Sequence, residues 1–232
     1  MTQGPLLSVV IPVYNERATI EELLRRVAAA PFDKEIIVVD DGSTDGTREV
    51  LAGLDGTVPG GIRIALLPAN AGKGAALRRG FQEARGAIVL VQDADLEYDP
   101  ADYPRLLAPL LDGEADVVYG SRFLAGRARG RPGQRIGNRV LTLWSNLFTG
   151  LRLSDVYVCY KVFRREVLDG LALRENRFGF EAEVTARIAR RGWRVREVPI
   201  SYRPRTHAEG KKIKLKDALA GLWCVVRYGL FG

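Results

Sequence analysis

Two aspartates separated by a single residue follow an apolar segment near the middle of the chain. Asp93 and Asp95 come after residues 87–91, an Ala-Ile-Val-Leu-Val run that is typical of a buried strand. Ligands of open α/β sheets bind outside the carboxyl ends of the strands. Paired carboxylates are hard ligands for Mg²⁺ or Mn²⁺, which are usually shared with substrate phosphates. Alone, an Asp-x-Asp pair is more often two solvated loop residues, so the rest of the chain decides between the two interpretations.

The elements that would position this pair alternate regularly through the first half of the chain. Strand patterns occupy residues 7–13, 35–39, 62–66, 87–91 and 117–119, and helical patterns occupy residues 15–29, 44–54, 73–84 and 101–111. Strands that alternate with helices of this length predict parallel βαβ units with right-handed crossovers. The expected fold class is therefore α/β, with a mostly parallel central sheet flanked by helices.

The second half is less regular, and it is basic. Helical spacing covers residues 138–151, 181–190 and 214–228, strand patterns cover 156–163 and 194–202, and an Arg/Gly-rich loop is expected over 125–133. The formal charge is +7, and the basic excess lies in residues 122–139 and 187–216. No RNA-binding aromatic motif or zinc spacing accompanies these stretches, so we favour anionic substrates and lipid headgroups over nucleic acid.

Composition narrows the class of protein further. The 232 residues are 47% hydrophobic, which predicts a packed core rather than disorder. Cys159 and Cys224 are too far apart for a metal or redox motif, and a reducing compartment fits them. We expect neither a signal peptide nor a transmembrane helix, and hence a cytoplasmic location. Since no linker or internal repeat is evident, a single domain over residues 1–232 is expected.

Polar residues also follow the other predicted strands. Tyr14 could stack on a base and Glu16 could accept from base or ribose at the N-terminus of the next helix, although ordinary capping is the alternative. Asp41 is expected to bind ribose or base donors, whereas Asp45 is interpreted as a helix N-cap. Lys73, between two glycines, supplies a cation for phosphate, but the spacing of a P-loop is absent.

Taken together, five motifs in order resemble glycosyltransferase family 2, whose members have the GT-A fold. The motifs are Pro-Val-Tyr-Asn-Glu (12–16), Val-Asp-Asp-Gly-Ser-Thr-Asp-Gly-Thr (39–47), Asn-Ala-Gly-Lys-Gly-Ala-Ala (70–76), Asp-Ala-Asp-Leu-Glu (93–97) and Gly-Ser-Arg-Phe (120–123). The resemblance covers nearly the whole chain and is greatest to dolichol- and polyprenyl-phosphate hexose synthases. It implies a nucleotide-sugar-binding half, residues 1–122, and an acceptor-binding half, residues 123–232, which ends in an amphipathic helix.

The resemblance also implies roles for individual residues. Those implied to hold the donor nucleotide are Pro12, Tyr14, Glu16, Val39 and Asp41. Asp93, Ala94 and Asp95 are implied to grip ribose, diphosphate and metal, and Glu97 stands where mannose synthases often have Gln as a further metal ligand. Arg122 is implied to face phosphate groups, which suit its bidentate guanidinium. The expected catalytic residues are Asp93, Asp95 and Arg122.

Acceptor-side motifs match the family less closely. Residues 158–160 are Val-Cys-Tyr in place of the usual Ser-Gly-Phe. Glu183 lies on a helix that resembles the acceptor-side helix, and it is expected to be a substrate-binding residue. Arg205 and Lys211 lie in a segment that resembles the closing loop, in which a Lys replaces the usual Ser, and both are implied to contact the donor diphosphate and the acceptor phosphate. His207, the only histidine, is expected to be a solvated loop residue.

The expected reaction is inverting transfer of a hexose, mannose or glucose, from a nucleotide-diphosphate sugar to a polyprenyl or dolichyl phosphate. Mg²⁺ or Mn²⁺ would neutralise the leaving diphosphate. An acceptor phosphate is already anionic, whereas a soluble, polysaccharide or glycolipid hydroxyl acceptor would need a base such as Glu181 or Glu183. A non-catalytic nucleotide-sugar-binding module is a further alternative, against which the three carboxylates at 93, 95 and 97 argue.

A lipid acceptor requires an approach to the bilayer. One face of the last predicted helix is apolar and adjoins several lysines; its members are Leu215, Leu219, Leu222, Trp223 and Val226. Such a face suits peripheral contact with an anionic membrane, here at its cytoplasmic side, and it suits packing on the core equally well. The sequence does not predict an oligomeric state.

Overall fold

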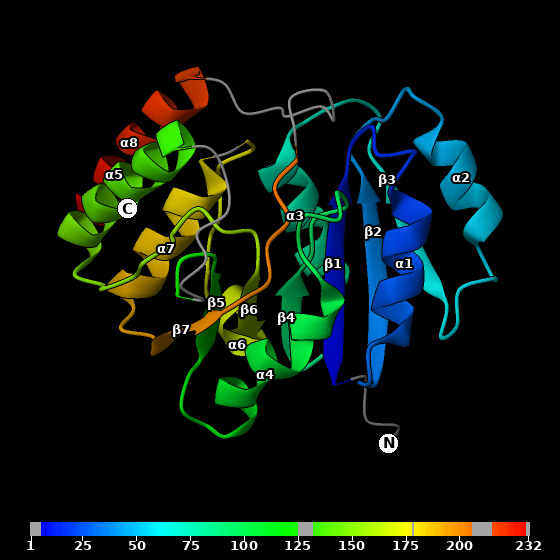
Figure 1. Ribbon diagram of the computed structural model, residues 1–232, viewed down its shortest axis with the longest axis horizontal. Coiled ribbons are helices and arrows are strands. Elements are labelled where there is room, and N and C mark those ends of the chain that lie inside the picture. Colours follow the sequence, from blue (N-terminus) through cyan, green and yellow to red (C-terminus); the bar gives the residue numbers. More distant parts are fainter. Residues whose placement is uncertain (1–5, 125–131, 178, 206–214, 231–232) are drawn as a thin grey trace.

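A single seven-stranded sheet with helices around it forms the protein (Figure 1). The computed structural model describes residues 6–124, 132–177, 179–205 and 215–230. In chain order the strands are β1 (Leu7–Val13), β2 (Lys34–Asp40), β3 (Ile62–Leu66), β4 (Ile88–Val91), β5 (Val117–Ser121), β6 (Lys161–Arg164) and β7 (Val195–Pro199). The helices are α1 (Ile20–Ala29), α2 (Thr47–Leu54), α3 (Lys73–Glu83), α4 (Tyr103–Leu111), α5 (Pro132–Thr149), α6 (Arg165–Asp169), α7 (Phe180–Arg190) and α8 (Leu215–Leu230), with a 3₁₀ turn η1 (Pro100–Asp102) before α4.

The strand order is β3-β2-β1-β4-β6-β5-β7. Strand β1 pairs in parallel with β2 and β4, β2 pairs in parallel with β3, and β5 pairs in parallel with β7. Only β6 runs antiparallel to its two neighbours, β4 and β5. The expected α/β fold with a mostly parallel central sheet is therefore confirmed, with β6 as the exception.

Close packing fixes α3 against the middle of the sheet. The apolar side chains of β1 and β2 are buried, as is usual for parallel strands covered on both faces. Gly80 of α3 lies so close to β1 that a Cβ atom there would come within 2.3 Å of the Val10 side chain. Since no larger residue fits, the glycine lets α3 approach, and the helix begins with Lys73 at the carboxyl edge of the sheet.

Two helices begin later than the sequence pattern predicts, and the backbone shows why. A helix was expected from residue 15, but Asn15 has a left-handed φ of 54° and α1 begins at Ile20. The next helix was expected from residue 44, but Gly46 has a φ of 95° and α2 begins at Thr47. Both deviations lengthen the loops at the carboxyl ends of β1 and β2, where ligands of such sheets bind.

In the second half, the expected strand over residues 156–163 is wrong in its first part. Strand β6 covers only Lys161–Arg164, although the preceding residues are mostly buried. The buried ammonium group of Lys161 donates to the carbonyl oxygens of Val156 and Val158, so this segment is held as a loop. An apolar run signals burial, but it does not show whether the backbone pairs in a sheet.

The last helices pack together beyond β5 and β7 (Figure 1). Helix α5 begins at Pro132, inside the expected Arg/Gly-rich loop and before the expected start at residue 138. Helices α7 and α8 meet through five buried residues, Ala182, Ala186, Cys224, Val225 and Tyr228. None of the helices in the described ranges is both long and apolar enough to cross a bilayer.

Candidate active site

The carboxyl ends of β1, β2 and β4 lie side by side because β1 pairs in parallel with both of the other strands. Hydrogen bonds join the loops that follow them. The backbone N–H of Asn15 donates to Oγ of Ser43 at 2.9 Å, and Oγ1 of Thr19 donates to the carbonyl oxygen of Ala94 at 2.8 Å. The structure thus brings the segments expected to hold the donor nucleotide next to the Asp-x-Asp motif.

Lys73 connects this edge with the first turn of α7. Its Nζ lies 2.9 Å from Oδ1 of Asp93 and 3.4 Å from Oε1 of Glu181. Burial by itself would lower the pKa of Lys73, but the negative charges of Asp93 and Glu181 outweigh it and raise the pKa. The lysine expected to face phosphate is therefore already paired with two carboxylates.

Asp95 lies among like charges. Burial, followed by the negative charges of Asp93 and Glu97, raises the pKa of Asp95 to about 7. Arg205 opposes the rise, and its Nε donates to the backbone carbonyl of Asp95 at 3.0 Å. A bound divalent cation would relieve the repulsion in this group of carboxylates.

The structure does not assemble the three expected metal ligands. Glu97 directs its oxygens to the second half of the chain, where they accept from the backbone N–H of Arg205 at 2.7 Å and from the Tyr202 hydroxyl at 3.2 Å. Across the described ranges, no three His, Cys, Asp or Glu side chains lie close enough together to hold a metal. Asp93 and Asp95 still fit Mg²⁺ or Mn²⁺, since such ions usually take one or two carboxylates and complete their shell with phosphate oxygens and water.

An ion pair crosses from β1 to the segment after β7. Two nitrogens of the Arg205 guanidinium donate to the two carboxylate oxygens of Glu16, at 3.0 and 2.6 Å. Oγ1 of Thr19 also lies 3.0 Å from Oε2 of Glu16. Tyr14 and Pro12 are half-buried in the same region. The residues expected to face the donor thus lie at one edge, and Arg205 reaches it from the far end of the sequence.

Two residues expected to bind the donor nucleotide contribute to the structure around the donor site. The Asp41 carboxylate accepts from Nδ2 of Asn70 and from the backbone N–H groups of Ala71 and Gly72, at 2.7 to 2.9 Å. Burial raises the pKa of Asp41, and the two backbone hydrogen bonds oppose the rise. The side chain of Val39 is fully buried. In this structure Asp41 holds the loop that carries Lys73, and Val39 belongs to the core.

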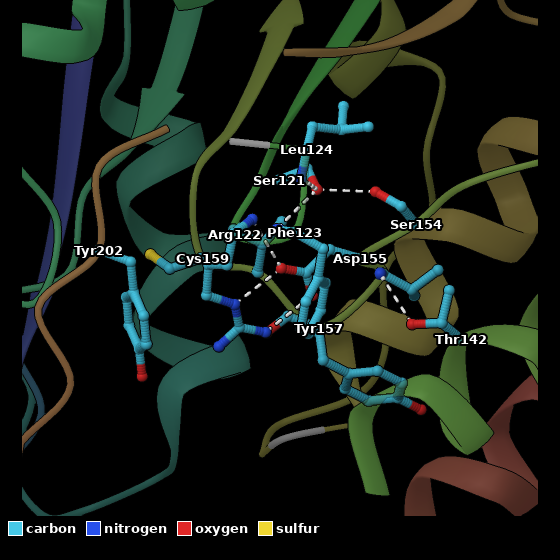
Figure 2. A network of polar contacts seen from close by, with 12 residues as sticks. Ser121, Arg122, Phe123, Leu124, Thr142, Ser154, Asp155, Tyr157, Cys159 and Tyr202 are labelled. Atoms are coloured by element: carbon cyan, nitrogen blue, oxygen red, sulfur yellow. Dashed lines mark hydrogen bonds and ion pairs between the residues drawn. The ribbon is translucent and has the colours of Figure 1, made fainter. Parts of the chain in front are cut away.

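Arg122 is engaged by a partner within the chain. Its Nε and Nη2 each lie 2.7 Å from an oxygen of the fully buried Asp155 (Figure 2). The guanidinium carbon also lies 5.2 Å from the centroid of the Tyr202 ring. The guanidinium edge expected to face phosphate is therefore used to hold the loop at Asp155 against β5.

A half-buried glutamate on β7 completes this group. Glu197 accepts from the backbone N–H groups of Ser154 and Asp155 at 2.7 and 3.0 Å. We use the term brace for Arg122, Asp155 and Glu197. Glu197 was not predicted from the sequence, because a single charged residue in a short strand belongs to no recognisable motif. Its role follows from its hydrogen-bond partners, which lie 42 and 43 residues earlier in the chain.

The two glutamates of α7 have different surroundings. Glu183 is fully buried and accepts from the backbone of Arg174 and Glu175 and from Nε of Arg187. Glu183 was expected to bind substrate, but in this structure its carboxylate holds the segment at Arg174 and Glu175. Glu181, two residues earlier, is the one that reaches Lys73 and lies near Asp93. Lys211 and His207 lie outside the described residues.

In the sequence, Cys159 is a cysteine outside any metal or redox motif and a departure from the family pattern. It is buried, and burial together with the neighbouring Asp93 raises the pKa of its thiol. The residue that replaces the usual glycine therefore adds a neutral thiol beside the Asp-x-Asp motif. The replacement of the usual glycine by Cys159 is the sequence feature that could have identified this residue.

Comparison with known proteins agrees with this geometry. The polyprenol monophosphomannose synthase of Mycolicibacterium smegmatis is 35% identical over 205 residues, which are 85% of this chain and 77% of that protein. The undecaprenyl-phosphate 4-deoxy-4-formamido-L-arabinose transferase of Pseudomonas fluorescens is 32% identical over 209 residues, 88% of this chain but 59% of that protein. The chain thus spans less than two thirds of the length of that second relative.

Solved structures agree as well. The glucosyl-3-phosphoglycerate synthase of Mycobacterium tuberculosis, in complex with Mn²⁺, UDP and glucosyl-3-phosphoglycerate, matches with a TM-score of 0.73 at 25% identity. The match covers 97% of this chain and 80% of that one, and another structure of that enzyme holds Mg²⁺ and UDP. This likeness confirms the GT-A architecture that the strand order and the Asp-x-Asp edge indicate.

The family itself follows from the domain match. The model of glycosyl transferase family 2 matches residues 8–171, a region that runs from β1 through the Asp-x-Asp motif, Arg122 and Asp155 to the end of α6. This region contains every strand but β7. By motif order, by fold and by this match, the chain belongs to glycosyl transferase family 2.

Proposed function

We propose that this chain transfers a hexose, mannose or glucose, from a nucleotide-diphosphate sugar to a polyprenyl or dolichyl phosphate, with inversion at the sugar. The observation that carries the proposal is the crowded pair Asp93 and Asp95, placed where the ends of β1, β2 and β4 meet. The lipid phosphate acceptor is supported by two relatives, one named for undecaprenyl phosphate and one for polyprenol monophosphomannose.

Asp93 and Asp95 would hold Mg²⁺ or Mn²⁺, which supplies positive charge to the leaving diphosphate. The related enzyme crystallised with Mn²⁺ or Mg²⁺ and UDP supports this assignment. Lys73 fixes Asp93 through its 2.9 Å ion pair, and Thr19 fixes the backbone between the two aspartates. The protein thus orients both carboxylates before substrate arrives, so that little reorganisation is left for the reaction itself.

The donor nucleotide would lie along the ends of β1 and β2. Tyr14 offers a ring for the base, and Glu16 offers oxygens for the base or ribose. Arg205, now paired with Glu16, places a guanidinium beside Asp95 and would move to the diphosphate when the donor enters. An acceptor phosphate needs no general base, since its attacking oxygen is already anionic.

A hydroxyl acceptor is the second candidate, and Glu181 favours it. A hydroxyl must lose its proton, and Glu181 is a carboxylate near Asp93 that could take it. The related structure that holds glucosyl-3-phosphoglycerate also supports a phosphorylated small-molecule acceptor. The two candidates share the donor and the metal, so they differ only in the acceptor.

Two measurements in sequence test the proposal. A thermal-shift screen of GDP-mannose, UDP-glucose, GDP and UDP with Mn²⁺ is expected to raise the midpoint for one base. The matching donor, labelled in its sugar, is then incubated with undecaprenyl phosphate in detergent or with 3-phosphoglycerate. Label that moves into the organic phase supports the lipid acceptor. Label that moves only to 3-phosphoglycerate supports the hydroxyl acceptor, and no donor binding at all contradicts both.

We also propose peripheral contact with an anionic membrane, through α5 more than through α8. Four exposed apolar residues form one stripe along α5, namely Ile136, Val140, Leu143 and Leu147. Arg135 and Arg139 are exposed on the same helix. An exposed apolar stripe beside arginines suits the interface of an anionic bilayer. A cytoplasmic location, where both a nucleotide sugar and this membrane face are present, remains our prediction.

For α8, the structure supports both interpretations of its apolar face. Cys224, Val225 and Tyr228 are buried against α7, which is the packing alternative. Trp223 is 63% exposed, and Trp144 of α5 donates to the carbonyl oxygen of Leu222. Leu215 and Leu219 have side chains outside the described part. The membrane-facing surface therefore comprises the α5 stripe and Trp223.

Flotation with phosphatidylglycerol vesicles at low salt tests this surface. The protein is expected to float, and Leu143→Ser with Leu147→Ser is expected to reduce the floated fraction at least several-fold. Leu66→Ser is a matched control, because Leu66 is a similarly exposed leucine at the opposite end of the sheet, on β3. Absence of flotation, or equal loss in the control, contradicts the assignment.

A further inference from the structure

The first turn of α7 contains a carboxylate with unused hydrogen-bonding capacity. Oε1 of Glu181 lies 3.4 Å from the Lys73 ammonium, while Oε2 is buried and has no hydrogen-bond partner among the residues that the structure describes. The residue as a whole is only 5% exposed. A buried acceptor without a donor is unfavourable, so such an atom in a folded protein calls for an explanation.

Glu183 shows that this is not a general property of the helix. Its two oxygens accept four hydrogen bonds, from the backbone of Arg174 and Glu175 and from Arg187. The two glutamates are in the same turn and both are buried, yet among the described residues only Glu183 has partners for both of its oxygens. The unused oxygen is therefore a local feature of the surroundings of Glu181.

Position links Glu181 to the reacting centre. The Lys73 ammonium lies within 3.4 Å of both Asp93 and Glu181, so the two carboxylates share a single cation. The side chains of Lys73 and Asp93 are 18% and 22% exposed, so the group opens to solvent on their side. The terminal torsion of a glutamate is broad, so a partial rotation of the Glu181 carboxylate can direct the unused oxygen toward a ligand on that side.

The chemistry of the surroundings selects the ligand class. A second anion would be repelled by Asp93, Asp95 and Glu181, and Lys73 already occupies the place of a cation. A neutral hydroxyl can donate to the unused oxygen without adding charge. In a nucleotide-diphosphate sugar, the hexose is attached to the phosphate that Asp93 would hold through the metal, and it carries several such hydroxyls.

We propose that Glu181 accepts a hydrogen bond from a hydroxyl of the transferred hexose and thereby selects the sugar that the enzyme accepts. This inference rests on the proposed function, because it needs a nucleotide sugar at Asp93. It differs from the role of a general base, since the bond is made to the donor and persists when the acceptor is a phosphate. It also assigns different tasks to Lys73's two partners, with Asp93 toward the diphosphate and Glu181 toward the sugar.

Binding of the free nucleotide and of the nucleotide sugar separates this role from a structural one. Titrations with Mn²⁺ compare the wild type with Glu181→Gln and Glu181→Ala, using the donor identified by the thermal-shift screen and its nucleoside diphosphate. We expect the alanine variant to weaken the nucleotide sugar about 10- to 100-fold, as for a hydrogen bond to a charged group, with a smaller loss for glutamine. The nucleoside diphosphate should bind as in the wild type.

A control and an analogue series make the test specific. Glu166→Gln changes an exposed glutamate in the first turn of α6 and should alter neither affinity. Monodeoxy analogues of the donor sugar identify the hydroxyl: one analogue should bind about 10- to 100-fold more weakly to the wild type, and the same analogue should lose almost nothing further with Glu181→Ala.

Several outcomes would overturn the inference. They are an equal loss of nucleotide and nucleotide sugar, an unchanged affinity for both, or deoxy penalties that add fully to the effect of the substitution. Titration with the nucleoside diphosphate alone shows whether each variant still has a working nucleotide site. A wild type that binds neither UDP-glucose nor GDP-mannose contradicts the proposed function instead, so the two failures are distinguishable.

Discussion

Two partly buried groups of charges lie at the carboxyl edge of the sheet, and they are built differently. In the brace, both oxygens of Asp155 accept from Arg122 (Figure 2). Glu197 accepts from the adjoining backbone. In the Lys73 group, one ammonium serves both Asp93 and Glu181, and one oxygen of Glu181 has no partner in the part of the chain described.

The difference indicates that the brace stabilises the fold, whereas the Lys73 group can bind a ligand. A saturated buried ion pair resists substitution because removing one partner leaves an uncompensated charge. An unsaturated group has capacity for a ligand, and a site that must bind a metal and a sugar cannot use all of its own oxygens. Both groups contain one basic residue and two acids, so residue types alone do not distinguish them.

The largest expected effect breaks the brace. Asp155→Ala leaves the Arg122 guanidinium buried without its partner, and we expect the free energy of unfolding to fall by about 3–5 kcal/mol. Urea unfolding measures this. Asp169→Ala, which removes an exposed carboxylate 3.7 Å from Arg165, is the control and should change it by less than about 1 kcal/mol. Equal losses would show that the brace is not special.

Asp95 should behave in the opposite way. We expect Asp95→Asn to reduce turnover about 100- to 1,000-fold, as for loss of a transition-state electrostatic contact. Its stability without metal should be unchanged or higher, because the substitution removes a carboxylate whose pKa is raised by burial and by Asp93 and Glu97. Turnover at saturating Mn²⁺ and the melting temperature in EDTA are measured together. Near-normal turnover would contradict the assignment of Asp95.

The two glutamates of α7 give a matched pair within one turn. Glu183→Gln weakens four hydrogen bonds to a buried anion, and we expect it to lower the free energy of unfolding by about 1.5–3 kcal/mol. Glu181→Gln should lower it by less than about 1 kcal/mol, since half of that carboxylate is unpartnered among the described residues. If Glu181→Gln lowered the free energy of unfolding more than Glu183→Gln, the assignment of Glu183 to the fold and Glu181 to the ligand would be wrong.

The smallest expected change in stability concerns Lys161, whose pKa is affected by Glu181 of the Lys73 group and by Asp155 of the brace. Burial lowers the pKa of Lys161 from 10.5 to about 8, and the charges of Glu181 and Asp155 partly oppose the decrease. Between these values the unfolded chain binds more protons than the folded one, so stability rises with pH in this window. Relative to Lys161→Met, the wild type should gain about 1–3 kcal/mol between about pH 8 and pH 10.

Urea unfolding of both proteins across that range makes the measurement. The difference between wild type and variant isolates Lys161 from tyrosines that also titrate at high pH. At neutral pH the variant should be less stable, because the carbonyl groups of Val156 and Val158 lose their donor. A difference that stays constant with pH would mean that the amine keeps an ordinary pKa in the fold.

Much of the fold could be predicted from the sequence. The bounds of β1 and β3 agree with the predicted ranges to the residue. Strand β1 is covered on both faces, so nearly all of its residues are buried. The Asp-x-Asp pair was placed at the end of β4 by the same logic. Prediction was wrong where backbone geometry intervened, as at Asn15 and Gly46, and where a buried loop imitates a strand before β6.

The candidate site was predicted as a set of residues but not as a set of contacts. Motif order indicated Glu16, Lys73, Asp93, Arg122 and Arg205, and each lies at the carboxyl edge or beside it. The pattern could not show that Asp155 engages Arg122, that Asp41 holds the loop before α3, or that Glu181 rather than Glu183 faces Lys73.

What the sequence by itself determined is the α/β alternation, the position of the two aspartates and the membership of the family. Local patterns suffice for these, because strand and helix periods and short motifs are properties of neighbouring residues. Only the tertiary structure decided which charges pair. Glu16 and Arg205 are 189 residues apart, and Lys73 meets Glu181 only because α7 returns to the end of β4. Whether a buried carboxylate supports the fold or stays ready for a ligand depends on such partners, and long-range packing alone brings them together.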